Sequence, residues 1–184
     1  MRRFSSFIFH KILGWEIVGD FSSKTVKKCI IIVVPHTSWH DFYIGLLIRQ
    51  LSSVKISFLA KKELFKWPLG WYFTKVGGIS LDRTSGQNKV EAIAEFFAKR
   101  KELRLALAPE GTRKKVKEWK TGFYHIAKTA EIPIIMVAFD FGKKQTVISK
   151  PFYPTNDIKK DFKHMYNFFI GVKGKIPEYS FDGS

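Results

Sequence analysis

Residues 29–42 read CIIIVVPHTSWHDF, and this stretch decides the architecture that the rest of the chain has to fit. Its apolar first half predicts a strand. The residues from Pro35 onward connect that strand to a helical pattern that begins near Ser38. His36 lies in the connection, and Asp41 lies in the first turn of the predicted helix. The stretch therefore predicts a strand, a short loop and a helix in direct succession.

Further apolar runs and helical patterns alternate along the chain. The predicted strands span residues 29–34, 55–60, 103–108 and 132–139, with a short strand after Gly77 and Gly78, and the predicted helices span residues 41–51, 85–100, 119–131 and 157–170. Strands separated by helices predict an α/β fold with a mixed, largely parallel sheet flanked by helices. We expect a single domain over residues 1–184, with its motif-bearing core at residues 29–139.

The net charge indicates which kinds of partner the protein attracts, and the cysteine content indicates in which cellular compartment it works. The formal net charge is +16, and each half of the chain carries +8, so the charge is spread rather than confined to a tail. Such a charge attracts anionic partners, whether nucleic acid, anionic lipid or phosphorylated metabolites. The single cysteine, Cys29, lies in an apolar run, which excludes a disulfide framework and a cysteine-based zinc site and favours a reducing compartment.

The N-terminal residues 1–19 have an amphipathic pattern. Phe4, Phe7, Ile8, Ile12 and Trp15 can gather on one side of a helix while Arg2, Arg3 and Lys11 stay in water. The chain contains no apolar run of 18 residues, so we expect no membrane-spanning helix. Two interpretations of residues 1–19 remain open: a helix at a membrane interface, and an ordinary helix docked on the core.

His36 and Asp41 are the first candidate pair for catalysis. Ligands of open α/β sheets gather beyond the carboxyl ends of strands, which is where this loop lies. With His36 in the loop, the Asp41 carboxylate can meet the imidazole, fix its tautomer and stabilise its protonated form, as an aspartate does for a general base. The alternative is a capping box, Ser38-x-x-Asp41, in which Asp41 only satisfies backbone donors.

A metal site is not predicted at this loop. His36, His40 and Asp41 could be imagined as ligands, but His10, His125 and His164 offer no evident third ligand from a distant part of the chain.

Two further loops follow predicted strands. In LALAPEGTR, Gly111 permits a tight turn, Arg113 offers a planar fork suited to phosphate, and Glu110 can tie the loop down through an arginine or backbone donors. In VGGISLDR, Arg83 ends a short strand. Each loop taken alone also fits a charged surface turn. Together, the three loops would supply one imidazole with its carboxylate partner and two guanidinium groups.

These motifs resemble the conserved blocks of one family, the glycerolipid acyltransferase superfamily, whose best-known members are the 1-acylglycerol-3-phosphate (lysophosphatidic acid) acyltransferases. His36 and Asp41 match its H-x4-D motif. GGISLDR at residues 77–83, PEGTR at residues 109–113 and IPIIMV at residues 132–137 are similar to its second, third and fourth blocks, in the same order. The sequence departs from the family at Pro35, where Asn is common, and at Met136, where a second proline is usual.

The resemblance implies transfer of a fatty acyl group from a coenzyme A or acyl-carrier-protein thioester to a lysophospholipid or related lipid acceptor. His36 would be the general base, Asp41 would orient it, and Arg83 and Arg113 would bind the acceptor phosphate. Glu110, Gly111 and Thr112 would shape that pocket. It also implies no metal and no bound cofactor, peripheral attachment to the cytoplasmic face of a membrane, and acyl carrier protein as a conceivable partner.

Other chemistries lack their motifs, and the remaining rival is a non-catalytic basic module. The sequence contains no G-x-S-x-G, G-x-G-x-x-G or G-x4-G-K-[ST]. Charge and aromatic content alone favour a module that binds nucleic acid or anionic membrane lipid. Residues 60–78 mix lysines with tryptophans, which fits a membrane-facing element or core aromatics beside solvated lysines. Pro68 and Gly70 predict a break between two short helices there.

Overall fold

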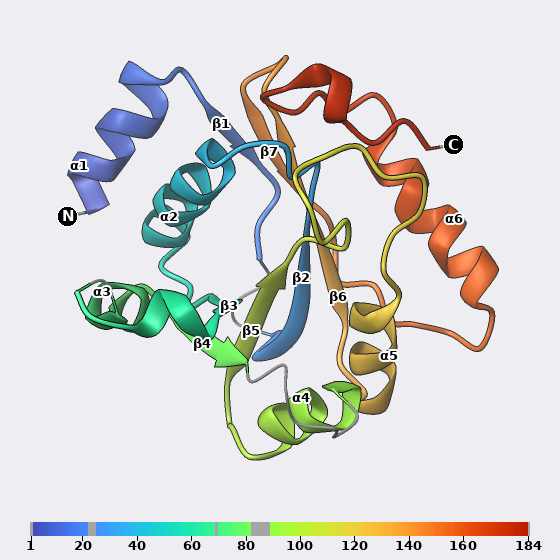
Figure 1. Cartoon of the computed structure of the whole chain (residues 1–184). Coiled ribbons are helices and arrows are strands. Elements are labelled where there is room, and N and C mark those ends of the chain that lie inside the picture. Colours follow the sequence, from blue (N-terminus) through green and yellow to red (C-terminus); the bar gives the residue numbers. More distant parts are fainter. Residues whose placement is uncertain (1, 22–24, 69, 82–88, 184) are drawn as a thin grey trace.

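Seven strands form one sheet in the computed structural model, which describes residues 2–21, 25–68, 70–81 and 89–183 (Figure 1). The sheet order is β1-β7-β6-β2-β5-β3-β4. The five strands from β6 to β4 run parallel, β7 runs antiparallel to β6, and β1 runs parallel to β7. The strands are β1 (Glu16–Val18), β2 (Lys28–Val34), β3 (Ser57–Lys61), β4 (Gly78–Leu81), β5 (Leu103–Leu107), β6 (Ile134–Asp140) and β7 (Gln145–Ile148). The predicted mixed, largely parallel sheet is confirmed.

Helices cover both faces of this sheet, with α1 and α2 on one face and α4, α5 and α6 on the other (Figure 1). The helical segments are α1 (Arg2–Ser6), its π-helical continuation η1 (Phe7–Ile12), α2 (His40–Ser52), η2 (Lys62–Phe65), α3 (Gly70–Lys75), α4 (Lys89–Ala98), α5 (Gly122–Thr129), α6 (Ile158–Phe169) and η3 (Pro177–Tyr179). Because successive strand residues point to opposite faces, Ile30 and Ile32 of β2 pack with α4 to α6, whereas Cys29 and Ile31 pack with η1 and α2. β2 is thus buried on both sides.

The N-terminal segment differs from its prediction. Residues 2–12 are helical, but Glu16–Val18 is a strand at the edge of the sheet, so the helix is shorter than the expected 1–19. Phe9, which was not in the predicted apolar set, is the residue buried in the core, because a π-helical turn changes the angular spacing of side chains. Trp15 is also buried, but it lies beyond the helix.

Most other predicted elements are confirmed with shifted ends. α5 begins at Gly122 rather than at residue 119, and Trp119 packs in the core before the helix starts. The described part of the helix predicted over 85–100 is Lys89–Ala98. The break near Pro68 is present, between η2 and α3. β7 was missed because QTVI is short and follows a tight turn closed by the Asp140 carboxylate, which accepts hydrogen bonds from the backbone N–H groups of Gly142 and Lys143.

Candidate active site

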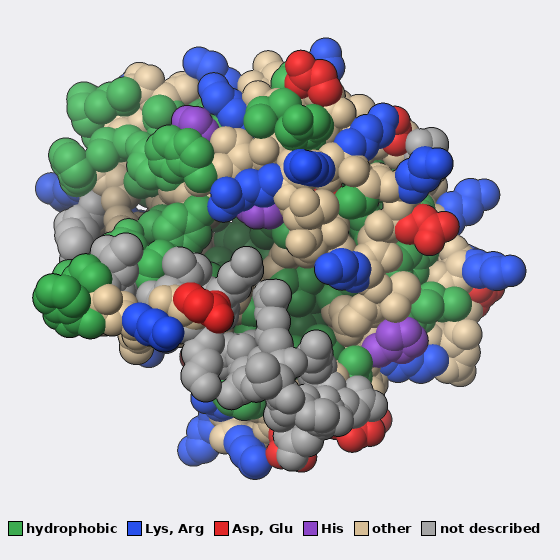
Figure 2. Space-filling model, viewed as in Figure 1, with side chains coloured by type: hydrophobic (Ala, Val, Ile, Leu, Met, Phe, Trp, Pro, Cys, Tyr) green, Lys and Arg blue, Asp and Glu red, His purple; other side chains and the backbone are tan. Residues whose placement is uncertain are grey.

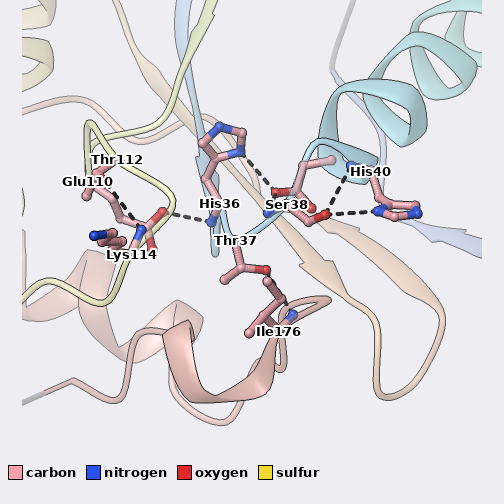
Figure 3. A network of polar contacts seen from close by, with 9 residues as sticks. His36, Thr37, Ser38, His40, Glu110, Thr112, Lys114 and Ile176 are labelled. Atoms are coloured by element: carbon pink, nitrogen blue, oxygen red, sulfur yellow. Dashed lines mark hydrogen bonds and ion pairs between the residues drawn. The ribbon is translucent and has the colours of Figure 1, made fainter.

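The candidate site lies where β2 and β5 end. These strands are adjacent and parallel, so their carboxyl ends bring the loop at residues 35–38 next to the loop at residues 109–113. Figure 3 shows His36 and Glu110 side by side at this junction. The fold therefore joins the H-x4-D and PEGTR motifs, which are more than 70 residues apart in the sequence.

His36 and Asp41 are in direct contact. The His36 Nδ1 atom lies 3.0 Å from Asp41 Oδ2, and the two side chains are 27% and 2% exposed. A carboxylate only accepts, so in the neutral ring Nδ1 carries the proton and Nε2 keeps a free electron pair. The imidazole is thus oriented by a buried acid while one edge stays open to solvent.

Asp41 also satisfies a backbone donor, as its alternative interpretation required, although α2 begins at His40 with Trp39 as the N-cap and no side-chain capping bond. The same Oδ2 atom accepts a hydrogen bond from the Ser38 backbone N–H at 2.9 Å, and Ser38 Oγ pairs with His40 Nδ1. The two interpretations of Asp41 are therefore compatible, since one oxygen holds both the ring of His36 and the backbone two residues later.

Glu110 ties the second loop to the first. Its carboxylate is buried, with the residue 4% exposed, and Oε2 accepts the His36 backbone N–H at 2.7 Å. Burial raises the pKa of Glu110 to about 7, although the hydrogen bond from His36 opposes this increase. The expected tie to a backbone donor is present, and the donor belongs to the histidine residue itself.

The residues that follow Glu110 in this loop are exposed and include cations. Gly111 has φ of +67°, in the left-handed region that favours glycine, so the backbone conformation requires glycine there. Thr112 and Arg113 are exposed, and Thr112 Oγ1 accepts the Lys114 backbone N–H. Arg113 is therefore exposed to solvent in the loop that Glu110 ties to His36.

The third candidate loop is only partly visible. β4 runs parallel to β3, so its carboxyl end points to the same edge of the sheet as β2 and β5. Arg83, predicted to bind phosphate, lies outside the described residues.

Several other sequence expectations concern groups outside this pair of loops. Burial raises the pKa of the Cys29 thiol to about 12, which leaves it protonated and a poor nucleophile. Among the described residues, no group of three or more His, Cys, Asp or Glu side chains is placed to hold a metal ion. Within the same residues, no helix has the length and apolar character needed to cross a membrane.

Thr37 was not singled out by sequence reasoning. Its side chain is buried, and its Oγ1 accepts a hydrogen bond from the backbone N–H of Ile176, in the C-terminal segment (Figure 3). A polar residue between two candidate functional residues was the only local signal for it. Its partner is 139 residues away.

Comparisons with known proteins agree with one another on the family. The family model described as "Acyltransferase" matches residues 16–140. Over 133 residues the chain is 29% identical to the 1-acyl-sn-glycerol-3-phosphate acyltransferase of Saccharomyces cerevisiae, covering 68% of this chain and 42% of that protein. Over 130 residues it is 32% identical to the enzyme of the same name from Cocos nucifera, covering 67% and 41%. The chain thus spans about two fifths of the length of these curated relatives.

A solved structure shares the fold. The crystal structure of the 1-acyl-sn-glycerophosphate (LPA) acyltransferase PlsC from Thermotoga maritima aligns with a TM-score of 0.60 and 21% sequence identity. The alignment covers 91% of this chain and 74% of that one. It supports the α/β architecture, including most of the chain beyond residue 140.

Proposed function

This chain belongs to the acyltransferase family, and we propose that it transfers a fatty acyl group from a thioester to the hydroxyl of a lysophosphatidic acid-like acceptor. The observation that carries the proposal is the 3.0 Å contact between a partly exposed His36 and the buried Asp41. This is the arrangement of an oriented general base. The names of the curated relatives support the class of acceptor.

The proposed reaction needs one base and no enzyme nucleophile, because a thioester is already activated. Nε2 of His36 takes the proton of the acceptor hydroxyl as that oxygen attacks the thioester carbonyl carbon. Asp41 stabilises the positive charge that the ring gains. Collapse of the tetrahedral adduct breaks the carbon–sulfur bond, and the imidazolium returns its proton to the departing sulfur. General base catalysis of this kind contributes about 10²- to 10⁴-fold in rate.

Cations beside the base would hold the anionic parts of the substrates. Arg113 projects from the loop that Glu110 ties to His36, and Lys114 and Lys115 follow it, all three exposed. A guanidinium matches phosphate through two parallel hydrogen bonds. We propose that Arg113, together with Arg83, binds the acceptor phosphate, and that Gly111 and Thr112 shape that pocket.

The test is direct transfer. Purified protein would be incubated with radiolabelled fatty acyl-coenzyme A, or with the acyl-carrier-protein thioester, and a panel of lysolipids with and without phosphate. We expect product with a phosphate-bearing acceptor, and a loss of about 10²- to 10⁴-fold in His36→Ala. His125→Ala, an exposed histidine on α5, is the matched control and should keep full activity. Comparing the assays with the two thioesters shows whether coenzyme A or acyl carrier protein is the acyl donor.

If no acyl transfer occurred with any donor and acceptor, the proposed acyltransferase activity would be refuted. Tight, salt-sensitive binding of nucleic acid by such an inactive protein would instead support the non-catalytic basic module.

We further propose that the protein attaches peripherally to the cytoplasmic face of a membrane. Exposed apolar side chains gather over α1 and over α3, at the left edge of Figure 2. The side chain of Trp67 is 92% exposed. Clusters of exposed apolar side chains mark surfaces that bind a partner or a membrane. Lysines and arginines next to such side chains attract anionic headgroups. The exposed residues are Phe4, Phe7 and Ile12 at the N-terminus and Trp67, Trp71 and Tyr72 around α3.

Vesicle co-sedimentation tests the attachment. We expect binding to vesicles containing phosphatidylglycerol, and weaker binding by the double variant Trp67→Ala/Trp71→Ala. Tyr153→Ala removes an aromatic side chain that is also largely exposed but lies before α6, so it should bind like the wild type. Equal binding by all three proteins would contradict a role for α3.

A further inference from the structure

Three successive residues of the His36 loop are tied to three different segments of the chain. The His36 backbone N–H is held by Glu110, and the Ser38 backbone N–H is held by Asp41. Between them, Thr37 Oγ1 accepts the Ile176 backbone N–H at 3.2 Å. Two of these ties come from the family's own motifs, and the third comes from residues 171–183, which we call the C-terminal strap.

The strap runs along the carboxyl edge of the sheet, past three neighbouring strands. The Lys173 carbonyl accepts the backbone N–H of Phe141, directly after β6. Gly174 and Ile176 then pass the loop that follows β2, and Asp182 forms an ion pair with Lys115, in the loop that follows β5. The strap therefore connects the surroundings of both candidate catalytic loops.

The strap abuts the His36 loop closely. A Cβ built on Gly174 would lie 2.7 Å from both Thr37 Oγ1 and Thr37 Cγ2, and 3.1 Å from Pro35 Cγ. Only glycine fits against these two residues without displacing them. Pro35 is one of the two positions at which the sequence departs from the family, and its ring forms part of the surface on which the strap lies.

The strap has its own anchor away from this contact. Phe181 is buried between Trp119 and Tyr166, with ring centroids 4.8 Å and 4.9 Å away. Nearer the loop, Ser180 Oγ accepts the Gly174 backbone N–H at 2.9 Å. Burial of Phe181 stabilises the fold without requiring Gly174 to touch the His36 loop, so the Thr37 contact has no evident purpose in core packing.

We propose that the C-terminal strap is a positioning element that holds the His36 loop in its productive geometry through Thr37 and Pro35. The inference rests on the proposed function for its effect on rate. It goes beyond it by assigning a role to residues that lie outside the matched span 16–140. Because a displacement of about 1 Å can cost about 10²-fold in rate, a loop held on three sides keeps the base aligned.

Gly174→Ala tests the contact by inserting a single methyl group. We expect kcat to fall about 10- to 100-fold, with little change in the KM of either substrate, since the loop moves and the anion-binding residues do not. Gly122→Ala is the matched control, because a Cβ there meets nothing within 4 Å. Adding Thr37→Ala to Gly174→Ala removes both atoms that the new methyl meets most closely and should recover part of the rate.

A second pair of variants keeps the test valid if Gly174→Ala folds poorly. Thr37→Val removes the acceptor for the Ile176 N–H at nearly constant volume, whereas Thr37→Ser keeps it. We expect Thr37→Val to lower kcat about 10-fold and Thr37→Ser to stay within about twofold of the wild type. For each folded variant, ¹⁵N NMR of the His36 imidazole should show changed chemical shifts in Gly174→Ala and Thr37→Val only.

The outcomes separate the two proposals. Wild-type kcat and unchanged His36 signals in both Gly174→Ala and Thr37→Val would overturn the role of the strap and leave the acyltransferase proposal intact. A wild-type protein that transfers no acyl group would overturn the proposed function instead, and the His36 NMR signals would then decide the positioning claim alone. The positioning claim would also be overturned if the rate fell only in proportion to the amount of folded protein while the His36 signals stayed unchanged.

Discussion

The loops that follow β2 and β5 are neighbours in space and opposite in character. In residues 35–38, Pro35, Thr37 and Ser38 are buried, and each backbone or side-chain group described above has a partner. In residues 111–115 every residue is exposed. The first loop is held in a fixed geometry, and the second presents cationic side chains to solvent.

The signs of the charges follow the same division. Asp41 and Glu110 are buried carboxylates, both directed at the His36 loop. Arg113, Lys114 and Lys115 are exposed cations in the other loop. Burying a charge is costly unless it is hydrogen-bonded, so the acids are committed to structure and orientation. Lys115 already pairs with Asp182, so we expect Arg113 to be the main cation available to a ligand. Changes in the first loop should therefore lower kcat, and changes in the second should raise KM.

The largest expected effect comes from Asp41→Asn. The amide can still accept one hydrogen bond, so the fold should persist, but it no longer fixes the Nδ1–H tautomer or stabilises the imidazolium. We expect kcat to fall about 10²- to 10⁴-fold, with KM nearly unchanged. Steady-state kinetics with circular dichroism as a folding control would check this. Full turnover in Asp41→Asn would mean that Asp41 serves only as a helix cap.

The next effect concerns the stability of the first loop against pH. The pKa of Glu110 is raised from 4.5 to about 7 by burial, so the folded protein retains this proton where the unfolded chain has released it. The stabilisation is complete below pH 4.5 and is lost as pH rises toward and through about 7. Its full size is about 3 kcal/mol.

Glu110→Gln isolates this contribution, because the amide accepts the His36 N–H but does not titrate. We expect the free energy of unfolding of the variant, relative to the wild type, to increase by up to about 3 kcal/mol between about pH 5 and pH 8. Urea denaturation at several pH values measures it. Parallel pH dependences of the two proteins would show that Glu110 titrates normally in the folded state.

The smallest effect belongs to the exposed loop. Arg113→Ala should raise the KM of a phosphate-bearing acceptor about 10- to 100-fold, the range expected for a lost hydrogen bond between charged groups. Arg113→Lys should recover only part of the lost affinity for the acceptor, because lysine cannot form two parallel hydrogen bonds to a phosphate. kcat should change less than KM. A fall in kcat with constant KM would remove the distinction between the two loops.

Sequence patterns predicted the elements whose environment is uniform along their length. β2 is buried on both faces, so its apolar run is continuous and unambiguous. β1 and β7, which are three and four residues long, were missed, whereas the Gly77-Gly78 pair marked the equally short edge strand β4. Turn chemistry at Asp140 and Gly142 could have indicated β7. The departure at Met136 also has a local reason, since its backbone N–H donates to Ser149 Oγ, which proline could not do.

In the candidate site, contacts between residues close in sequence were predicted, and contacts between distant residues were not. The contact of His36 with Asp41 was predicted because it spans five residues and depends only on where the helix starts. The role of Glu110 toward His36 spans 74 residues and required the pairing of β2 with β5. The contact of the strap with Thr37 spans 139 residues and follows no motif.

The α/β architecture, the candidate base with its acid and the cationic loop beside them can be predicted from sequence alone, because periodicity and short spacings are local properties of the chain. Three contacts became visible only in the folded chain: Glu110 holds the histidine backbone, Phe9 anchors the N-terminal helix, and the C-terminal strap lies on Pro35 and Thr37. Such contacts form between segments that are distant in sequence and are brought together by burial of apolar surface. The hydrophobic effect is non-directional, so no local sequence pattern specifies which segments meet.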